Sequence, residues 1–297
     1  MKFYTSVLPY RGRLLVRGVD KDGAQKKYRI NYKPSLFVPV GKETKYKTLD
    51  GRYVERIKFD SMPEATKWVN EYKNVTNFEY FGNTRHQYPF IADEFKGKID
   101  WDMNQIKLLT IDIECESENG FPSPEKADQP LICITVKDHT TKRIIVFGMG
   151  NFVNDRDDVQ YINCVTETGL VETFTKFWVE YNPDIITGWN VKFFDIPYLM
   201  NRFRYLMGDE WLNQFSPWGI VEQKSASVLF ASREQQVWNI MGVDTLDYLD
   251  LYRKFTFVRR ESYKLDYIGE VELGQNKLEN PYDTFKEFYS NDYQRFV

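Results

Sequence analysis

The feature that most constrains this chain is an apolar run at residues 108–115, Leu-Leu-Thr-Ile-Asp-Ile-Glu-Cys, which two carboxylates interrupt. Such a run predicts a buried β-strand. Because the side chains of a strand alternate between its two faces, we expect Asp112 and Glu114 on one face and the two isoleucines on the other. Two like charges so close repel each other, and their burial is costly unless a positive group lies between them. The run therefore predicts either a solvated edge strand or a site that binds a cation.

Strand and helix patterns alternate after about residue 104. Apolar runs predict strands at 105–114, 131–138, 142–149 and 184–190, and helical spacing predicts helices at 168–181 and 195–207. This alternation is typical of an α/β sheet.

The first hundred residues are richer in short strand patterns. Strands are predicted at 13–20, 26–32, 34–40 and 51–59, followed by a helix at 61–74 in which Ser61 and Glu64 have capping-box spacing. A polar stretch at 93–102 separates the two patterns. We therefore expect a β-rich α+β amino-terminal domain at 1–102 and an α/β domain at 103–297.

Composition excludes several classes of function. The 297 residues carry a net charge of −3, so binding of a polyanion must depend on local basic clusters or on bound metal. Cys115, Cys133 and Cys164 lack metal-site spacing, and an odd number of cysteines fits no closed disulfide framework, which favours a reducing cytosol. We find no signal peptide and no apolar stretch long enough to cross a membrane. His86 and His139, the only two histidines, are expected at polar surface or loop positions, so any catalysis should depend on carboxylates.

A third carboxylate is expected near the first two. Asp195 follows the strand predicted at 184–190 and precedes a helix, and sites in α/β sheets gather at such strand ends. Asp195 could instead be a helix cap. Oxygen ligands without His or Cys favour Mg²⁺ or Mn²⁺, and a pair of such ions is a common device for attack at phosphorus. Asp244, Asp247 and Asp250 are three residues apart and are expected along a solvated helix face.

Two ordered motifs carry a family resemblance. Thr-Ile-Asp-Ile-Glu at 110–114, followed by TGWNVKFFDIPYLMNR at 187–202, resembles the first two exonuclease motifs of family B DNA polymerases, most closely those of T-even-like phages. GFPSP, SPWG and VDTLDYLDLYRKF add to the likeness in the right order, and the resemblance covers nearly the whole chain. It implies an RNase H-like domain with a mixed sheet that proofreads DNA by 3′–5′ exonuclease activity.

The resemblance also implies roles for single residues. Asp112, Glu114 and Asp195 are expected to hold two Mg²⁺ or Mn²⁺ ions that hydrolyse the DNA end. Asn190 and Phe194 belong to the second motif and are expected to position the terminal nucleotides.

An aromatic residue, a hairpin and a basic stretch complete the expected DNA contacts. Phe121 resembles an aromatic that stacks on frayed single-stranded bases, although it could instead be a loop hydrophobe tucked onto the core. Residues 222–240 correspond to a β-hairpin that helps to separate primer from template, in which Lys224 and Arg233 could contact phosphate. Residues 257–264 form a dense basic stretch.

Two departures from the family pattern matter. Phe193 stands where related phage enzymes tend to have a small residue. In the family pattern the third exonuclease motif, Tyr-x-x-x-Asp, begins a few residues after Val297, so its tyrosine and fourth carboxylate, like the palm signatures of the polymerase, are expected to be missing here.

We therefore expect the amino-terminal and exonuclease portion of a phage family B polymerase in the host cytoplasm, either a fragment or one half of a split enzyme. Its partners would be a single-stranded 3′ end, a primer-template and a carboxy-terminal polymerase portion. One alternative is a non-catalytic nucleic-acid-binding or assembly subunit of a split polymerase. Another, an unrelated α/β hydrolase, has no nucleophile motif to support it.

Overall fold

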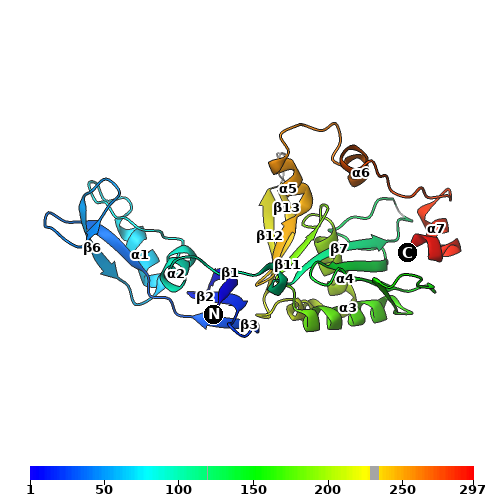
Figure 1. The fold of residues 1–297 in the computed structure, drawn as a ribbon, viewed down its shortest axis with the longest axis horizontal. Coiled ribbons are helices and arrows are strands. Elements are labelled where there is room, and N and C mark those ends of the chain that lie inside the picture. The colour runs from blue at the N-terminus through cyan, green and yellow to red at the C-terminus, as the bar shows by residue number, and fades with distance from the viewer. Residues whose placement is uncertain (119, 228–233) are drawn as a thin grey trace. The chain divides into compact units, whose positions relative to one another are not determined.

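A computed structural model of the chain describes residues 1–118, 120–227 and 234–297, whose contacts group them into two units, Met1–Gln105 and Ile106–Val297 (Figure 1). In the first unit, alternating strands form two small antiparallel sheets. One has the order β1 (Phe3–Tyr10), β2 (Arg13–Val19), β3 (Gln25–Ile30), and the other β4 (Ser35–Pro39), β6 (Tyr53–Lys58), β5 (Tyr46–Lys47). The strands predicted in this region are confirmed as β2, β3, β4 and β6, whereas β1 and β5 were not predicted.

Two helices complete the first unit, α1 (Met62–Tyr72) and α2 (Gln87–Glu94). The hydroxyl of Ser61 accepts a hydrogen bond from the backbone N–H of Glu64, which caps α1 as its sequence predicts. Ala65 on the inner face of α1 packs in a small core with Leu36 and Phe59. The predicted helix is confirmed, and it covers the second small sheet.

The second unit is built on a mixed sheet of six strands in the order β10-β9-β8-β7-β11-β14. Their bounds are β7 (Leu108–Cys115), β8 (Leu131–Asp138), β9 (Ile144–Gly148), β10 (Val159–Asn163), β11 (Ile185–Gly188) and β14 (Asp244–Asp247). β7, β11 and β14 run parallel to one another, whereas β8 is antiparallel to both β7 and β9. The carboxyl ends of β7, β11 and β14 therefore meet at one edge of the sheet.

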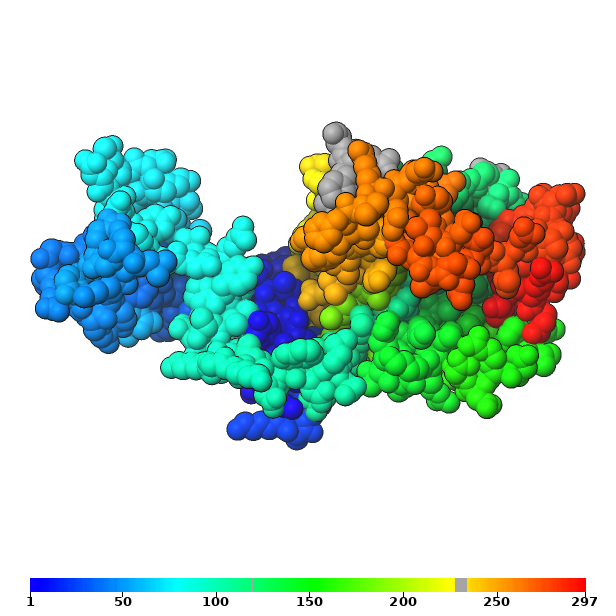
Figure 2. All heavy atoms as spheres, turned by 45° about the horizontal axis from the view of Figure 1, so that its top comes forward, coloured from blue at the N-terminus to red at the C-terminus, as the bar shows by residue number. Residues whose placement is uncertain are grey.

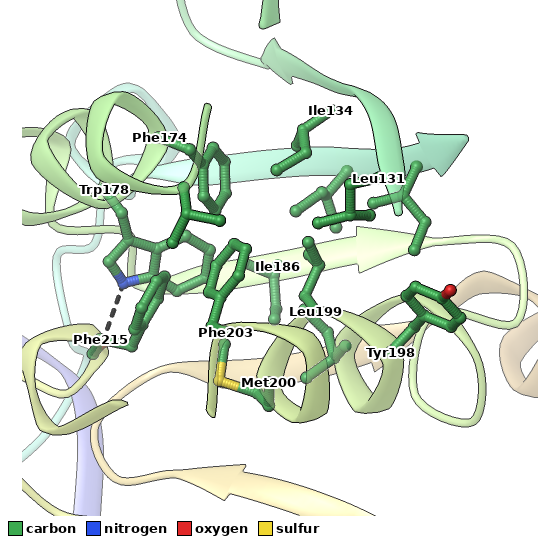
Figure 3. Packing of buried hydrophobic residues seen from close by; sticks show 14 of the residues in the cluster. Leu131, Ile134, Phe174, Trp178, Ile186, Tyr198, Leu199, Met200, Phe203 and Phe215 are labelled. Carbon is green, nitrogen blue, oxygen red and sulfur yellow. Dashed lines mark hydrogen bonds between the residues drawn. The ribbon is translucent and has the colours of Figure 1, made fainter. Parts of the chain in front are cut away.

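Helices α3 (Glu167–Tyr181) and α4 (Asp195–Met207) pack against this sheet, followed by a 3₁₀ segment at Asp209–Phe215. Figure 3 shows the resulting core, in which Phe174 and Trp178 of α3 meet Phe203 of α4 and Phe215. The indole N–H of Trp178 donates to the carbonyl of Phe215 at 2.9 Å, which satisfies a polar group that the core would otherwise bury unpaired. The core fixes α4 against β7, because Ile111 and Ile113 point into it.

The rest of the second unit surrounds the sheet. It consists of the hairpin β12 (Val221–Ser227) and β13 (Glu234–Ile240), then α5 (Tyr248–Phe255), α6 (Leu265–Leu273), α7 (Phe285–Asn291) and α8 (Tyr293–Phe296). The predicted hairpin is confirmed by the antiparallel register of β12 and β13, and Arg233 lies outside the described residues. Figure 2 shows the segment that contains α5 and α6, in orange, at the surface. No helix in the described ranges has the length and apolar character needed to cross a membrane.

Candidate active site

Two carboxylates lie side by side along β7. Asp112 is exposed and Glu114 is half-buried, while Ile111 and Ile113 on the opposite face are buried in the core. In the register with β8, Asp112 lies opposite Thr135 and Glu114 opposite Cys133. The strand thus presents both carboxylates on the face away from the core, as side-chain alternation predicts.

Asp195 joins this pair from another segment of the chain. It is the first residue of α4 and is 4% exposed, and its Oδ1 accepts a hydrogen bond from the backbone N–H of Ile113 at 3.3 Å. The cap position of α4 is occupied by Phe194, so the alternative prediction of Asp195 as a helix cap is wrong. The amide that Asp195 binds lies on β7 between Asp112 and Glu114.

The local sheet geometry leaves this amide available. Pairing of β11 with β7 ends at Thr187 and Thr110, so β11 does not reach the amide of Ile113. Gly188 ends β11 so close to β7 that an added Cβ would lie 2.6 Å from the carbonyl oxygen of Ile111. Glycine permits this close approach, and the chain then turns away and returns with Asp195.

The charge on Asp112 repels the other two carboxylates, Glu114 and Asp195. Asp112 reaches solvent, yet the surrounding protein atoms displace enough water from its carboxylate to raise its pKa. Burial also raises the pKa of Glu114 to about 7, with help from the charge on Asp112. The pKa of Asp195 is raised well above its usual range, chiefly by burial and then by Asp112. These carboxylates lack a sufficient counter-charge, which is the electrostatic condition that a bound cation would relieve.

One positive side chain partly compensates this charge. Lys277, in the linker between α6 and α7, lowers the pKa of both Asp112 and Glu114. Its backbone N–H donates to Oδ1 of Asp266 at 2.7 Å, which fixes the linker at this point. Sequence reasoning missed Lys277, because a single lysine in a polar segment carries no pattern that relates it to a distant strand.

Asp247 holds the loop that leads to Asp195. Its carboxylate is 4% exposed and accepts hydrogen bonds from the backbone N–H groups of Asn190 at 3.1 Å, Lys192 at 3.0 Å and Leu249 at 2.9 Å. The first of these, Asn190, has a left-handed backbone conformation with φ of 64°.

The prediction that Asp244, Asp247 and Asp250 share a solvated helix face is wrong. Asp244–Asp247 is strand β14, and Asp247 caps α5. The three aspartates are spaced as on a helix, but they extend across the junction between β14 and α5. The signal that could have identified Asp247 is its place at the end of a short strand, where the edge of a parallel sheet collects functional side chains.

An aromatic pair lies beside the acidic group. Phe121 is 86% exposed, and its ring lies 5.4 Å from that of Phe194. Phe194 in turn stacks on Tyr198 with a centroid distance of 6.0 Å. The alternative prediction that Phe121 is tucked onto the core is therefore wrong, and its exposed ring is free to stack on a base. Phe193 is buried, and its carbonyl accepts a hydrogen bond from the Gln235 side chain of β13 at 3.0 Å.

Helix α4 also anchors the loop that carries Phe121. The hydroxyl of Tyr198 donates to the carbonyl of Gln129 at 2.6 Å, and the amide of Asn201 donates to the carbonyl of Pro124 at 2.7 Å. One helix thus bears Asp195 and fixes the far end of the aromatic loop.

A pocket of mixed charge adjoins the site, with Glu261 and Asp266 in its wall beside three cationic side chains. It has a volume of about 750 Å³, and its wall includes Asn190 and Lys277 together with Arg253 and Lys264. Lys264 comes from the basic stretch predicted at 257–264, whereas Arg260 from the same stretch is engaged by Glu272. Lys224 of the hairpin is exposed and lines a different pocket.

The donor set suits a hard divalent cation, since it offers only carboxylate oxygens. In the described part of the chain, however, no three Asp, Glu, His or Cys side chains converge closely enough to hold one ion together. The assignment of Asp112, Glu114 and Asp195 as metal ligands is therefore a proposal, taken up below.

Comparison with known proteins identifies the family. The model of the DNA polymerase family B exonuclease domain matches residues 64–268. The DNA-directed DNA polymerase of Escherichia phage RB69 is 30% identical over all of this chain and 35% of its own length. The corresponding polymerase of Enterobacteria phage T4 is 28% identical with the same coverage, and the DNA polymerase catalytic subunit of Elephantid herpesvirus 1 is 27% identical over 66% of the chain.

The chain spans about a third of the length of the phage relatives that it matches. The mixed six-stranded sheet flanked by helices agrees with the α/β, RNase H-like class that its sequence predicts. From these matches, the chain belongs to family B of the DNA polymerases and contains their exonuclease domain.

Proposed function

We propose that this chain is the amino-terminal and 3′–5′ exonuclease portion of a T4-like phage DNA polymerase. The proposal rests chiefly on one observation: Asp195 binds the amide of Ile113, between Asp112 and Glu114 on the same strand. Three carboxylates from two separate motifs are thereby brought to one edge of the sheet. Its substrate is then a single-stranded DNA 3′ end, presented from a primer-template by the carboxy-terminal polymerase portion.

Asp112, Glu114 and Asp195 would bind Mg²⁺ or Mn²⁺, with two ions in the complete site. Bound ions of this kind activate a water and stabilise the leaving oxygen at phosphorus. The raised pKa of all three carboxylates supports this assignment: burial is the main cause, the charge on Asp112 adds to it for Glu114 and Asp195, and a divalent cation would stabilise the charged forms.

The remaining side chains act on the DNA. Phe121 and Phe194 offer a ring pair to the terminal bases, and stacking of this kind tolerates every base. Lys277 brings a positive charge toward the phosphate that the carboxylates would otherwise repel. Asp247 fixes the backbone of Asn190 and so the loop that presents Asp195.

Metal-dependent cleavage tests the proposal. The chain is incubated with a 5′-labelled single-stranded oligonucleotide and Mn²⁺, and Asp112→Asn and Asp195→Asn are compared with Asp244→Asn, an exposed acid on β14. We expect weak cleavage from the isolated chain, because no three acidic side chains of the described residues converge closely enough to hold one ion, and we expect its loss in the first two variants only. Metal-independent cleavage, or cleavage that survives both substitutions, would contradict the assignment.

A second function is a non-catalytic nucleic-acid-binding or assembly subunit of a split polymerase. The lack of three converging ligands in the described residues favours it. Mixing the chain with a palm-bearing polymerase portion separates the two functions. If the complex proofreads, and if Asp195→Ala abolishes proofreading but leaves binding intact, the chain is not a non-catalytic subunit.

A further inference from the structure

The first unit contains a pocket that the proposed exonuclease function does not use. It has a volume of about 690 Å³ and lies where the β1–β2 turn meets α1 and the start of α2. The turn contributes Tyr10 and Arg11, and α1 contributes Met62, Pro63 and Lys67. The wall thus combines apolar and aromatic surface with two cationic side chains.

A buried histidine lines the same pocket. His86 was expected at a polar surface or loop position; it does lie in the turn before α2, but it is 7% exposed, so a surface position is wrong. Its Nε2 lies 3.5 Å from the hydroxyl oxygen of Thr66, while its Nδ1 has no hydrogen-bond partner among the described residues. Buried polar atoms are nearly always paired, so this nitrogen points to a group that the chain itself does not supply.

The hydrogen bonds around His86 fix which nitrogen carries the proton. The hydroxyl of Thr66 donates its own hydrogen to the carbonyl of Met62 at 3.0 Å. Thr66 can then only accept from His86, which places the imidazole proton on Nε2 and leaves Nδ1 as an acceptor. Burial lowers the pKa of His86, which keeps the ring neutral and the acceptor free at neutral pH. The missing partner is therefore a hydrogen-bond donor.

We propose that this pocket binds a nucleotide, with an N–H group of the base donating to Nδ1 of His86 and the phosphate held by Arg11 and Lys67. Tyr10, Met62 and Pro63 provide the flat and apolar surface that a base requires. Arg11 already lies over the ring of Tyr10, 5.1 Å from its centroid, so its charge stands beside the surface on which a base would rest. The ligand is either a free nucleotide or a nucleotide within a single strand.

Removal of Glu71 should change nucleotide affinity in the opposite direction to removal of Arg11 or Lys67. Glu71 lines the pocket and pairs with Lys67 at 3.8 Å, so it competes with a phosphate for the same cation. Removal of this carboxylate should strengthen nucleotide binding, an effect that a purely structural role of the residue would not produce.

Ring-nitrogen NMR of the full chain tests the pocket directly, because the chain has only two histidines and His139→Gln assigns their signals. The probes are dAMP, dCMP, dGMP, dTMP and inorganic phosphate, all in EDTA to suppress binding at the carboxylates. We expect at least one nucleotide to shift the Nδ1 signal of His86 to that of a hydrogen-bonded nitrogen at millimolar concentration or below. No shift with any nucleotide would mean that water satisfies His86, and it would overturn the proposal, as would an equal shift with phosphate alone.

Calorimetry on variants provides the second measurement. Arg11→Gln, Lys67→Gln and His86→Leu should each weaken nucleotide binding by about five- to ten-fold, the effect of one lost polar contact. Glu71→Gln should tighten binding by about two- to five-fold. Lys58→Gln, an exposed lysine of β6 outside the pocket, should leave binding unchanged. Equal affinity in all variants would refute the site.

A tetranucleotide distinguishes the two sources of the ligand. Tighter binding of the tetranucleotide than of any mononucleotide, with the same dependence on Arg11, identifies a single strand, and the reverse order identifies a free nucleotide. Because these measurements exclude metal and use residues of the first unit only, their failure leaves the proposed exonuclease function standing.

Discussion

Glu114 shows how strongly a single residue depends on charges from other segments. Its carboxylate is half-buried beside Asp112, and a compensating charge on this pair comes from Lys277 in a distant linker. The pKa of Glu114 near 7 means that the metal-free protein holds a proton there at mildly acidic pH. Under the proposed assignment of Glu114 as a metal ligand, proton binding and metal binding would therefore compete at this residue.

The stability of the metal-free chain should fall as the pH rises. Between the unfolded pKa of Glu near 4.3 and the folded value of about 7, the folded chain retains a proton that the unfolded chain has lost. The stabilisation that this proton provides is fully present below the unfolded pKa and is lost as the pH rises through the folded pKa. The free energy of unfolding should fall by on the order of 1–3 kcal/mol. Denaturant unfolding in EDTA at pH 5 and pH 8 measures the loss.

Glu114→Gln should flatten this pH dependence, whereas Glu55→Gln, at an exposed position of β6, should not. Added Mg²⁺ should restore stability to the unsubstituted chain at pH 8. A chain whose stability is the same at pH 5 and pH 8 would contradict the strained carboxylate site.

Phe121 is the residue whose role is easiest to isolate, because its ring is 86% exposed. Phe121→Ala should weaken binding of a single-stranded 3′ end by about 1–3 kcal/mol without loss of folding stability. Fluorescence anisotropy with a labelled oligonucleotide measures the change. Phe257→Ala, which removes a fully exposed phenylalanine outside the aromatic pair, is the matched control. An equal loss in both variants would show that the effect is not specific to Phe121 and would contradict its proposed stacking role.

At the scale of elements, the short strand β14 does more than close the sheet. It ends in Asp247, whose carboxylate receives two backbone N–H groups from the 189–194 loop and one from α5. The position of Asp195 therefore depends on a strand more than fifty residues later in the sequence. Buried N–H groups left without an acceptor are costly, which makes this carboxylate a strong constraint on the loop.

Asp247→Ala should destabilise the second unit by about 2–4 kcal/mol, because it leaves three amides without their acceptor. Asp247→Asn keeps one acceptor oxygen and should cost less, yet should still reduce metal-dependent cleavage by displacing the loop. Thermal unfolding and the oligonucleotide assay measure the two effects. Asp244→Asn at the start of the same strand is the control, and a similar loss there would argue against a specific role of Asp247.

At the scale of the whole molecule, periodicity predicted most elements, because strands and helices impose periods of two and 3.6 residues. It also placed Asp112 and Glu114 on one face. It could not predict the order of the sheet, which depends on long-range pairing, nor the contact of Asp195 with Ile113, which depends on where β11 ends. Asp247 was misread because a strand-to-helix junction imitates a helical spacing, and Lys277 and His86 are single residues without a pattern.

The register of β11 has a consequence for how the proposed nuclease activity could disappear in evolution. β11 pairs with β7 only as far as Thr187 and Thr110, and the amide of Ile113 is taken by a side chain instead of a neighbouring strand. If β11 paired with β7 for a few more residues, the backbone of β11 would bind the amide of Ile113 and displace the carboxylate of Asp195. A descendant could thus lose its nuclease through a change in strand length while every acidic residue remained in its sequence.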